Sequence, residues 1–207
     1  MRMVRGTICG VICFCLFSVC LATAQQQQEA QGKKHQEDKT KPDRTITANP
    51  EGDHPVKGVG QADKKFIKEA AIGDMGEVEL GQLAQQKAKD PDVKGFGERM
   101  VKDHSQNDDQ LKNLAQTQDV SLPATLSQKL QSEKSQLSKL SGAKFDQAYM
   151  VFMVSEHTKD VNKFKKEAQD AHDPAVKQYA QASLPVLESH LKQAQQVEKK
   201  VRNNPQQ

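Results

Sequence analysis

Four long stretches of this chain place apolar side chains at steps of three and four residues, and this spacing limits the fold more than any other feature. Such steps put side chains on one face of an α-helix, so each stretch predicts a helix with one buried face. Alternation at period two, which half-buried strands show, does not accompany them. The four predicted core faces are formed by Phe66, Ala70, Gly73, Glu77, Leu80 and Ala84; by Val93, Phe96, Met100, His104, Asn107, Leu111 and Leu114; by Met150, Met153, His157, Val161, Phe164 and Ala168; and by Val176, Tyr179, Ser183, Leu187, His190, Ala194 and Val197.

Two short turns join these helices in pairs. Asp90–Pro91 and Asp173–Pro174 each combine an N-cap residue with a proline at the first helical position. The connection between the two hairpins is longer and carries leucines at helical spacing between residues 126 and 140. We therefore predict an all-α fold, a ferritin-like four-helix bundle of two antiparallel hairpins joined by a long crossover that contains a short helix. The alternative is an up-down bundle of five helices.

The two hairpins also resemble copies of each other. Phe66 and Glu77 match Phe145 and Glu156, and the turn sequence "DPDVK" matches "DPAVK". The turns are four residues out of step with the other matches, so the repeat is weak on sequence alone. It agrees with the twofold pseudosymmetry of such bundles.

Residues 1–24 have the pattern of a secretory signal peptide. Arg2 and Arg5 precede an apolar run over residues 8–21, and small residues at 22–24 form a cleavage site. The run is shorter than the about 20 apolar residues of a membrane span, and no second apolar run follows it, so no transmembrane span is expected after cleavage. Lipidation at Cys20 is the alternative, although the bulky Val19 before it is unfavourable. The predicted location is periplasmic or secreted.

The cysteines and the charge bear on what the exported protein can bind. All four cysteines lie within residues 1–24, so the cleaved protein would have no thiol, and any metal would be held by oxygen and nitrogen ligands. The 30 basic and 27 acidic side chains are mixed along the chain, which leaves no strong field to attract nucleic acid.

Composition divides the remaining chain into three parts. Residues 25–61 contain almost no large apolar side chain and are rich in Gln, Lys, Asp, Gly and Pro, which predicts a disordered polar linker. The helical bundle is expected over residues 62–201, which is enough for one domain. Residues 202–207 are polar and are expected to form a disordered tail.

Each predicted core face carries one glutamate or histidine at a matching height. Glu77 and His104 lie at nearly equal separations before and after Pro91, which puts both roughly 20 Å from the turn. His157 and His190 are likewise placed at nearly equal separations before and after Pro174, so they also face each other. We expect one polar layer in the middle of the bundle.

The chemistry of this layer has two interpretations. Three imidazoles and a carboxylate suit Zn, Fe, Mn or Cu, so the layer predicts a site for one transition-metal ion. The alternative is a buried hydrogen-bonded network in which ionised Glu77 pairs with a protonated histidine. A di-iron centre is disfavoured, because no histidine of the layer belongs to a Glu-x-x-His motif. The predicted metal ligands are Glu77, His104, His157 and His190, and the acidic neighbours proposed as outer hydrogen-bond partners are Asp103, Glu156 and Glu188.

Several segments together resemble a family of exported bacterial proteins that carry a ferritin-like domain of unknown function and are often named as outer-membrane proteins. These segments are "FIKEAAIGDMGEVELGQLA", "MVKDHS", "LP" at residues 122–123, "GAKFDQAYMVFMVSEH" and "LPVLESHL". The resemblance extends over about residues 63–198. It implies a ferritin-like bundle located beyond the inner membrane, and it implies that the family's histidines correspond to His104, His157 and His190.

The motifs argue against some enzyme classes. The sequence has no Gly-rich phosphate loop and no nucleophile and base at suggestive spacing, which speaks against a hydrolase or a transferase. The sequence favours a binding or stress-protective module rather than an enzyme, and it names no protein partner. The competing hypothesis is a metal-dependent oxidoreductase.

Overall fold

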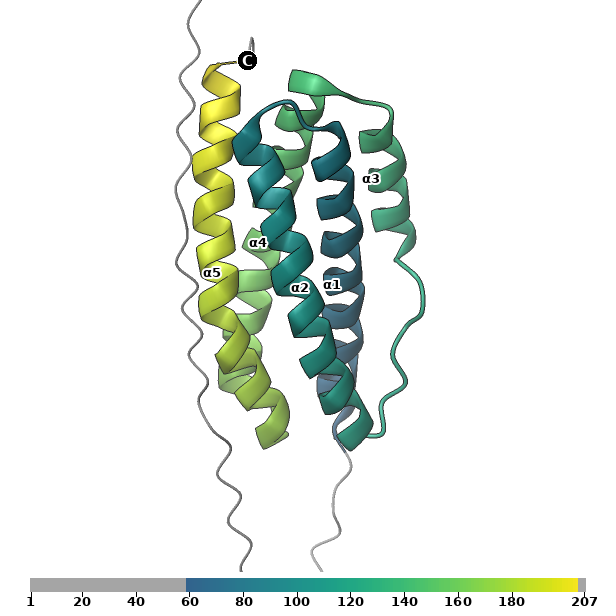
Figure 1. The fold of residues 1–207 in the computed structure, drawn as a ribbon. Helices are drawn as coiled ribbons and strands as arrows, with labels where there is room; N and C mark the ends of the chain where they lie inside the picture. Colours follow the sequence, from purple (N-terminus) through teal and green to yellow (C-terminus); the bar gives the residue numbers. More distant parts are fainter. Residues whose placement is uncertain (1–58, 205–207) are drawn as a thin grey trace, which may run out of the picture. The chain divides into compact units, whose positions relative to one another are not determined.

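The computed structural model describes residues 59–204, and within this range helices are joined by turns and connections without any strand. This confirms the all-α prediction for the described residues. The predicted signal peptide, nearly all of the predicted linker and the end of the predicted tail lie outside them. The helices are α1 Gln61–Lys87, α2 Pro91–Thr117, α3 Gln128–Ser138, α4 Gly142–Asp170 and α5 Pro174–Asn203 (Figure 1).

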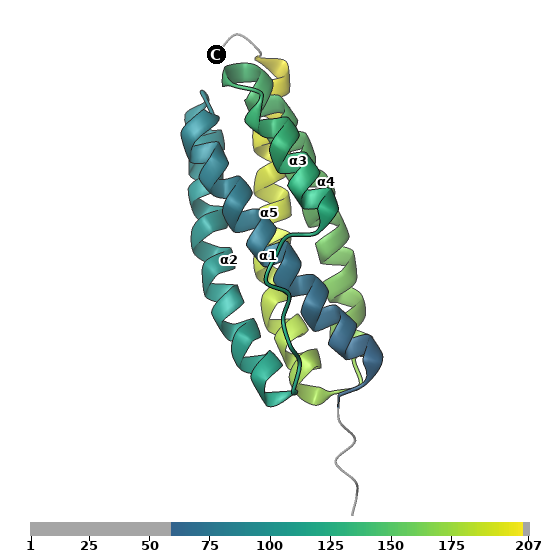
Figure 2. The same ribbon diagram turned by 90° about the vertical axis from the view of Figure 1, so that its right-hand side faces the viewer.

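The four long helices lie side by side in two antiparallel pairs (Figures 1 and 2). Helix α1 packs along α2 and helix α4 packs along α5, with a short turn inside each pair. The connection after α2 returns along the length of the helices before α4 begins, so α2 and α4 run in the same direction. Its last part is the short helix α3, which packs on α1 and α4.

Helices α2 and α5 begin at the caps that the sequence predicts. The Asp90 side chain accepts a hydrogen bond from the backbone N–H of Asp92, and Asp173 accepts from Ala175 and Val176. Each N-cap residue precedes a proline, whose missing N–H costs nothing in the first turn. These caps fix where the two turns end, and they therefore fix the height of every side chain that follows.

Each turn is also held by a carboxylate from the other hairpin. Asp146 of α4 accepts hydrogen bonds from the backbone N–H groups of Lys89 and Asp90. Asp63 of α1 accepts from those of His172 and Asp173 in the same way. The carboxylates thus lie at helix N-termini, where the helix dipole favours negative charge.

These contacts correct the register of the internal repeat. Asp63 corresponds to Asp146 and Asp90 corresponds to Asp173, and the separation along the chain is the same for both pairs. We call this separation, from position 63 to position 146, the repeat offset. The sequence-based match of Phe66 with Phe145 was therefore wrong by four residues, about one helical turn, because Phe66 corresponds to Tyr149. With the repeat offset, Asp63, Phe66 and Asp90 correspond to Asp146, Tyr149 and Asp173 without a slip.

Two apolar clusters fill the interior. One contains Phe96, Met100 and Tyr149, and the other contains Phe66 and Phe164. On every long helix, buried polar residues stand between the parts that belong to the two clusters. None of the five described helices is long and apolar enough to cross a membrane.

Candidate metal centre

The four side chains predicted to form a polar layer lie together in the middle of the helices. Glu77, His104, His157 and His190 come from α1, α2, α4 and α5, and each residue is at most 5% exposed. The ring centroids of His104 and His190 are 5.2 Å apart, those of His157 and His190 are 5.4 Å apart, and those of His104 and His157 are 5.9 Å apart. Each ring offers one nitrogen to a group in which all three nitrogens lie within 4.8 Å of one another.

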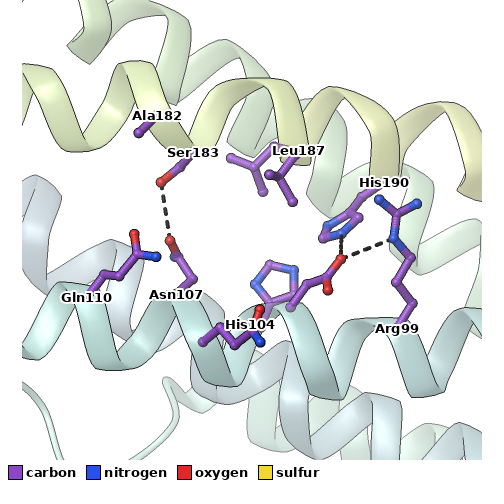
Figure 3. Close-up of a pocket in the computed structure, with 11 residues that line it drawn as sticks. Arg99, His104, Asn107, Gln110, Ala182, Ser183, Leu187 and His190 are labelled. Carbon is purple, nitrogen blue, oxygen red and sulfur yellow. Dashed lines mark hydrogen bonds and ion pairs between the residues drawn. The ribbon is translucent and has the colours of Figure 1, made fainter.

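One nitrogen of each ring is hydrogen-bonded to an oxygen. His104 Nδ1 lies 2.8 Å from Asp74 Oδ1, and His157 Nδ1 lies 3.0 Å from the carbonyl oxygen of Met153. His190 Nε2 lies 2.9 Å from Asp103 Oδ2 (Figure 3). Because a carbonyl or carboxylate oxygen only accepts, each of these nitrogens carries a proton and donates it. In a neutral ring the other nitrogen then presents a lone pair.

Four buried atoms of the layer have no hydrogen-bond partner among the described residues. They are Nε2 of His104, Nε2 of His157, Nδ1 of His190 and Oε1 of Glu77. The Glu77 oxygen lies 3.3 Å from Nε2 of His157, a short separation that does not have hydrogen-bond geometry. The other carboxylate oxygen of Glu77 is engaged, at 3.0 Å from Nδ1 of His104.

Charge is distributed unevenly over the layer. Burial lowers the pKa of His104, but the Glu77 and Asp74 carboxylates outweigh this and raise it to about 10. Burial raises the pKa of Glu77, but the charge of His104 and its hydrogen bond to the carboxylate outweigh that and lower it to about 2. Burial lowers the pKa of His157, and it lowers that of His190 to about 4. Without a metal, His104 and Glu77 therefore form an ion pair beside two neutral rings.

A second polar layer supports His104 from one side, and sequence reasoning missed its aspartate, Asp74. The Asn107 amide donates hydrogen bonds to Asp74 at 2.8 Å and to the Tyr179 hydroxyl at 2.7 Å, and Ser183 donates to Asn107 at 3.2 Å. Asp74 is 4% exposed, and burial raises the pKa of its carboxyl against the opposing effect of His104. The available signal was its place three residues before Glu77, which puts both on one side of α1.

The acidic neighbours of the histidines separate into two groups. Asp103 directly precedes His104 in the sequence, but it contacts His190 of α5 instead, and it also binds Arg99 at 3.1 Å. Glu156 instead pairs with Lys129 and Lys159, and Glu188 pairs with Lys165. The prediction that Glu156 and Glu188 support the histidines is not matched by these contacts, since both bind lysines on the outside of the helices.

One further acid near the layer escaped the sequence reasoning. Burial and the charge of Glu77 raise the pKa of Asp160 to about 7. Asp160 lies three residues after His157, as Glu77 lies three residues after Asp74, and the repeat offset relates the two pairs. The repeat in its corrected register was the signal that could have found it.

A cavity of about 250 Å³ lies between α2 and α5 and extends to the layer. Figure 3 shows the bonded pair Asn107 and Ser183 at one end, and His190 with Arg99 at the other. His104 and Leu187 lie between these ends. The layer is thus buried yet reachable from one side.

Solved structures with a similar fold come from other sequence families. A DUF305 fragment from Deinococcus radiodurans aligns with a TM-score of 0.61 and 12% identity, over 69% of this chain and 98% of that chain. A DUF305 protein from Streptomyces coelicolor, named as a candidate secreted protein, aligns with a TM-score of 0.59 and 14% identity, over 68% and 92%. CopM in the Cu(I)-bound form aligns with a TM-score of 0.56 and 16% identity, over 67% and 96%. At these identities the similarity shows a shared helical fold.

Sequence comparison identifies the family. No protein with a curated function matches the chain. A family described as a domain of unknown function, DUF4142, matches residues 48–197, which include all of α1 to α4 and most of α5. This chain belongs to the DUF4142 family.

Proposed function

We propose that this protein is an exported metal-binding module, a ferritin-like four-helix bundle that holds one transition-metal ion between Glu77, His104, His157 and His190. One observation carries the proposal: each of these four side chains has a buried nitrogen or oxygen without a hydrogen-bond partner. Among the described residues, the Tyr149 hydroxyl is the one other buried side-chain atom in this condition. Leaving a buried polar group unpaired costs about 1–3 kcal/mol. A hydrogen-bonded network accounts for the ring nitrogens that bond to Asp74, Met153 and Asp103. It does not account for the four atoms that have no partner.

One pair of donor atoms has the spacing that a small tetrahedral ion requires. Ligand atoms at 2.0–2.1 Å from such an ion lie about 3.3 Å from one another. Oε1 of Glu77 and Nε2 of His157 are 3.3 Å apart. The outer hydrogen bonds to Asp74, Met153 and Asp103 would hold the rings in the required tautomers, as outer partners of metal-binding histidines commonly do.

The donor atoms favour some metals over others. Three nitrogens and one oxygen suit Zn²⁺, Cu²⁺, Fe²⁺ or Mn²⁺, and the usual order of affinities puts Cu²⁺ and Zn²⁺ ahead of the other two. CopM binds Cu(I), an ion that prefers sulfur ligands. Since CopM shares the fold alone and the four unpaired atoms of the layer are nitrogen and oxygen, we propose a divalent ion for this protein.

Export is the second part of the proposal. It is supported by the signal-peptide pattern of residues 1–24 and by the name of the Streptomyces coelicolor neighbour as a candidate secreted protein. A metal-dependent oxidoreductase of the ferritin-like class is the second candidate function. The cavity that reaches His104 and His190 favours it, because a site for chemistry must admit a substrate.

Elemental analysis tests the proposal directly. The protein should be purified without a His tag, stripped with chelator and titrated with Zn²⁺, and it should bind one equivalent per chain with a gain in thermal stability. His157→Ala should abolish both effects. His172→Ala is the matched control, because His172 is an exposed histidine in the turn before α5. A protein that binds no metal, or that loses binding equally in both variants, would contradict the proposal. Stoichiometric copper, iron or manganese after purification would favour the oxidoreductase.

A further inference from the structure

The corrected repeat shows that the two hairpins contribute unequally to the layer. Positions three residues apart on each long helix face the centre, and the repeat offset relates those of the first hairpin to those of the second. The corresponding pairs are Asp74 with His157, Glu77 with Asp160, His104 with Leu187, and Asn107 with His190. Leu187 is the only apolar residue among these eight, and it stands where the other half has a histidine.

The cavity between α2 and α5 lies beside Leu187, where the two hairpins differ. Leu187 forms part of its wall, and His104 and His190 also line it (Figure 3). A leucine brings no donor atom to the layer, whereas the corresponding His104 does. The protein therefore offers open space beside the proposed ion at the position where its repeat would supply another ligand.

The far end of the cavity is polar. Asn107 and Ser183 line it and are hydrogen-bonded to each other. At the other end the Arg99 guanidinium and the Asp103 carboxylate pair at 3.1 Å, so their charges offset each other there. A molecule between these ends could contact the ion and hydrogen-bond to the Asn107 and Ser183 side chains.

We propose that this cavity admits a small inorganic anion, which binds the metal ion through an oxygen or nitrogen atom as an additional ligand. The inference rests on the proposed metal site. Three neutral imidazoles and the single charge of Glu77 leave a dication with a net charge of +1 in its ligand shell. This charge favours an anionic ligand over a neutral one, and the Asp74 carboxylate behind His104 opposes it in part. The cavity volume of about 250 Å³ is below the range of about 300–1,000 Å³ typical of sites for drug-sized ligands, which restricts the ligand to a small one.

Azide binding to the copper-loaded protein tests this proposal. Full-length mature protein is loaded with Cu²⁺, its metal content is measured, and azide is titrated while the azide-to-copper charge-transfer band is followed. Val186→Trp should fill the mouth of the cavity without touching a donor atom, since Val186 lines the cavity and is 43% exposed. Val151→Trp is the matched control, because Val151 is 57% exposed and lies away from this cavity on α4.

The wild type and Val151→Trp should bind azide alike, and Val186→Trp should bind it at least tenfold more weakly at unchanged copper content. If Val186→Trp does not fold, Ala182→Phe replaces it, since Ala182 is exposed and lines the same cavity. A protein that binds copper but gives no azide band would overturn the ligand proposal and leave the metal site standing. Equal azide affinity in all variants would overturn it too, because the anion would then arrive by another path. Failure to bind copper would remove the metal site itself, and the ligand proposal with it.

Discussion

The two hairpins share one framework but supply different chemistry to its centre. At the ends, Asp63 and Asp146 accept hydrogen bonds from the turn of the opposite hairpin in the same way. In the middle, the α1–α2 hairpin supplies the ion pair of Glu77 and His104, whereas the α4–α5 hairpin supplies two histidines whose pKa values are lowered by burial. The aspartates that bind the backbone of the turns are thus the same in the two hairpins, whereas the residues that would bind a metal ion differ.

The largest effect is expected from breaking the ion pair of the first hairpin. In metal-free protein, His104→Ala leaves the Glu77 carboxylate buried at 5% exposure without its cation. Removing one partner of a buried pair costs on the order of 3–5 kcal/mol, a large part of a typical stability of roughly 5–15 kcal/mol. Urea denaturation of the variant measures this loss.

A double-mutant cycle decides whether the loss comes from the pair. Glu77→Ala with His104→Ala should cost clearly less than the two single changes together. The same cycle with His157→Ala should show a smaller coupling, because His157 is neutral and lies 3.3 Å from Glu77 without a hydrogen bond. Equal couplings would mean that the two hairpins do not differ in charge as described.

The second prediction uses pH to separate the charged histidine from the neutral ones, again without metal. The pKa of His104 is raised from 6.5 to about 10, so between these values the folded state holds a proton that the unfolded state has lost, and stability falls as pH rises. The pKa of His190 is lowered from 6.5 to about 4, and that of His157 is lowered as well. Below pH 6.5 the unfolded state takes up protons first, so stability falls as pH decreases.

The free energy of unfolding should therefore fall as pH rises above about 7, with a slope of about 1.4 kcal/mol per pH unit for each proton involved. Below pH 6.5 the change should be smaller, because the raised pKa of Asp160 opposes the lowered pKa of His190. Denaturant titrations between about pH 5 and pH 9 measure both ranges. His104→Gln should flatten the alkaline side, and His190→Gln should reduce the slope on the acidic side. If His104→Gln keeps the alkaline slope, then His104 is not the charged member of the layer.

Much of the layer could be placed from the sequence because prolines mark the turns. Counting residues from Pro91 and Pro174 fixes height along a helix, since each residue adds about 1.5 Å. Height does not fix rotation, and this is why Asp74 was missed: its contact with His104 depends on how α1 is turned against α2. Glu156 directly precedes His157, but successive side chains on a helix point about 100° apart, so it lies outside. The metal role of the layer remains a prediction.

The smallest effect concerns two glycines that set how closely the first pair of helices packs. A Cβ added to Gly97 of α2 would lie 2.8 Å from the Gly81 carbonyl oxygen of α1, so the backbones approach directly one turn from Glu77. In the second hairpin the corresponding residues are Phe164 and Ala180, so this contact belongs to the first hairpin. Gly97→Ala should force the helices apart and destabilise by about 1–3 kcal/mol.

Gly73→Ala is the control for this prediction, and it should change the stability in the opposite direction. It also lies on α1, but an added Cβ there meets nothing within 4 Å. Without a steric conflict, alanine in a helix interior should stabilise by about 0.5–1 kcal/mol, because glycine loses more backbone entropy on folding. Thermal melts of the two variants should therefore shift in opposite directions. If Gly97→Ala is also stabilising, the close approach does not determine the spacing of α1 and α2, and the position of Glu77 against His104 must then depend on their ion pair.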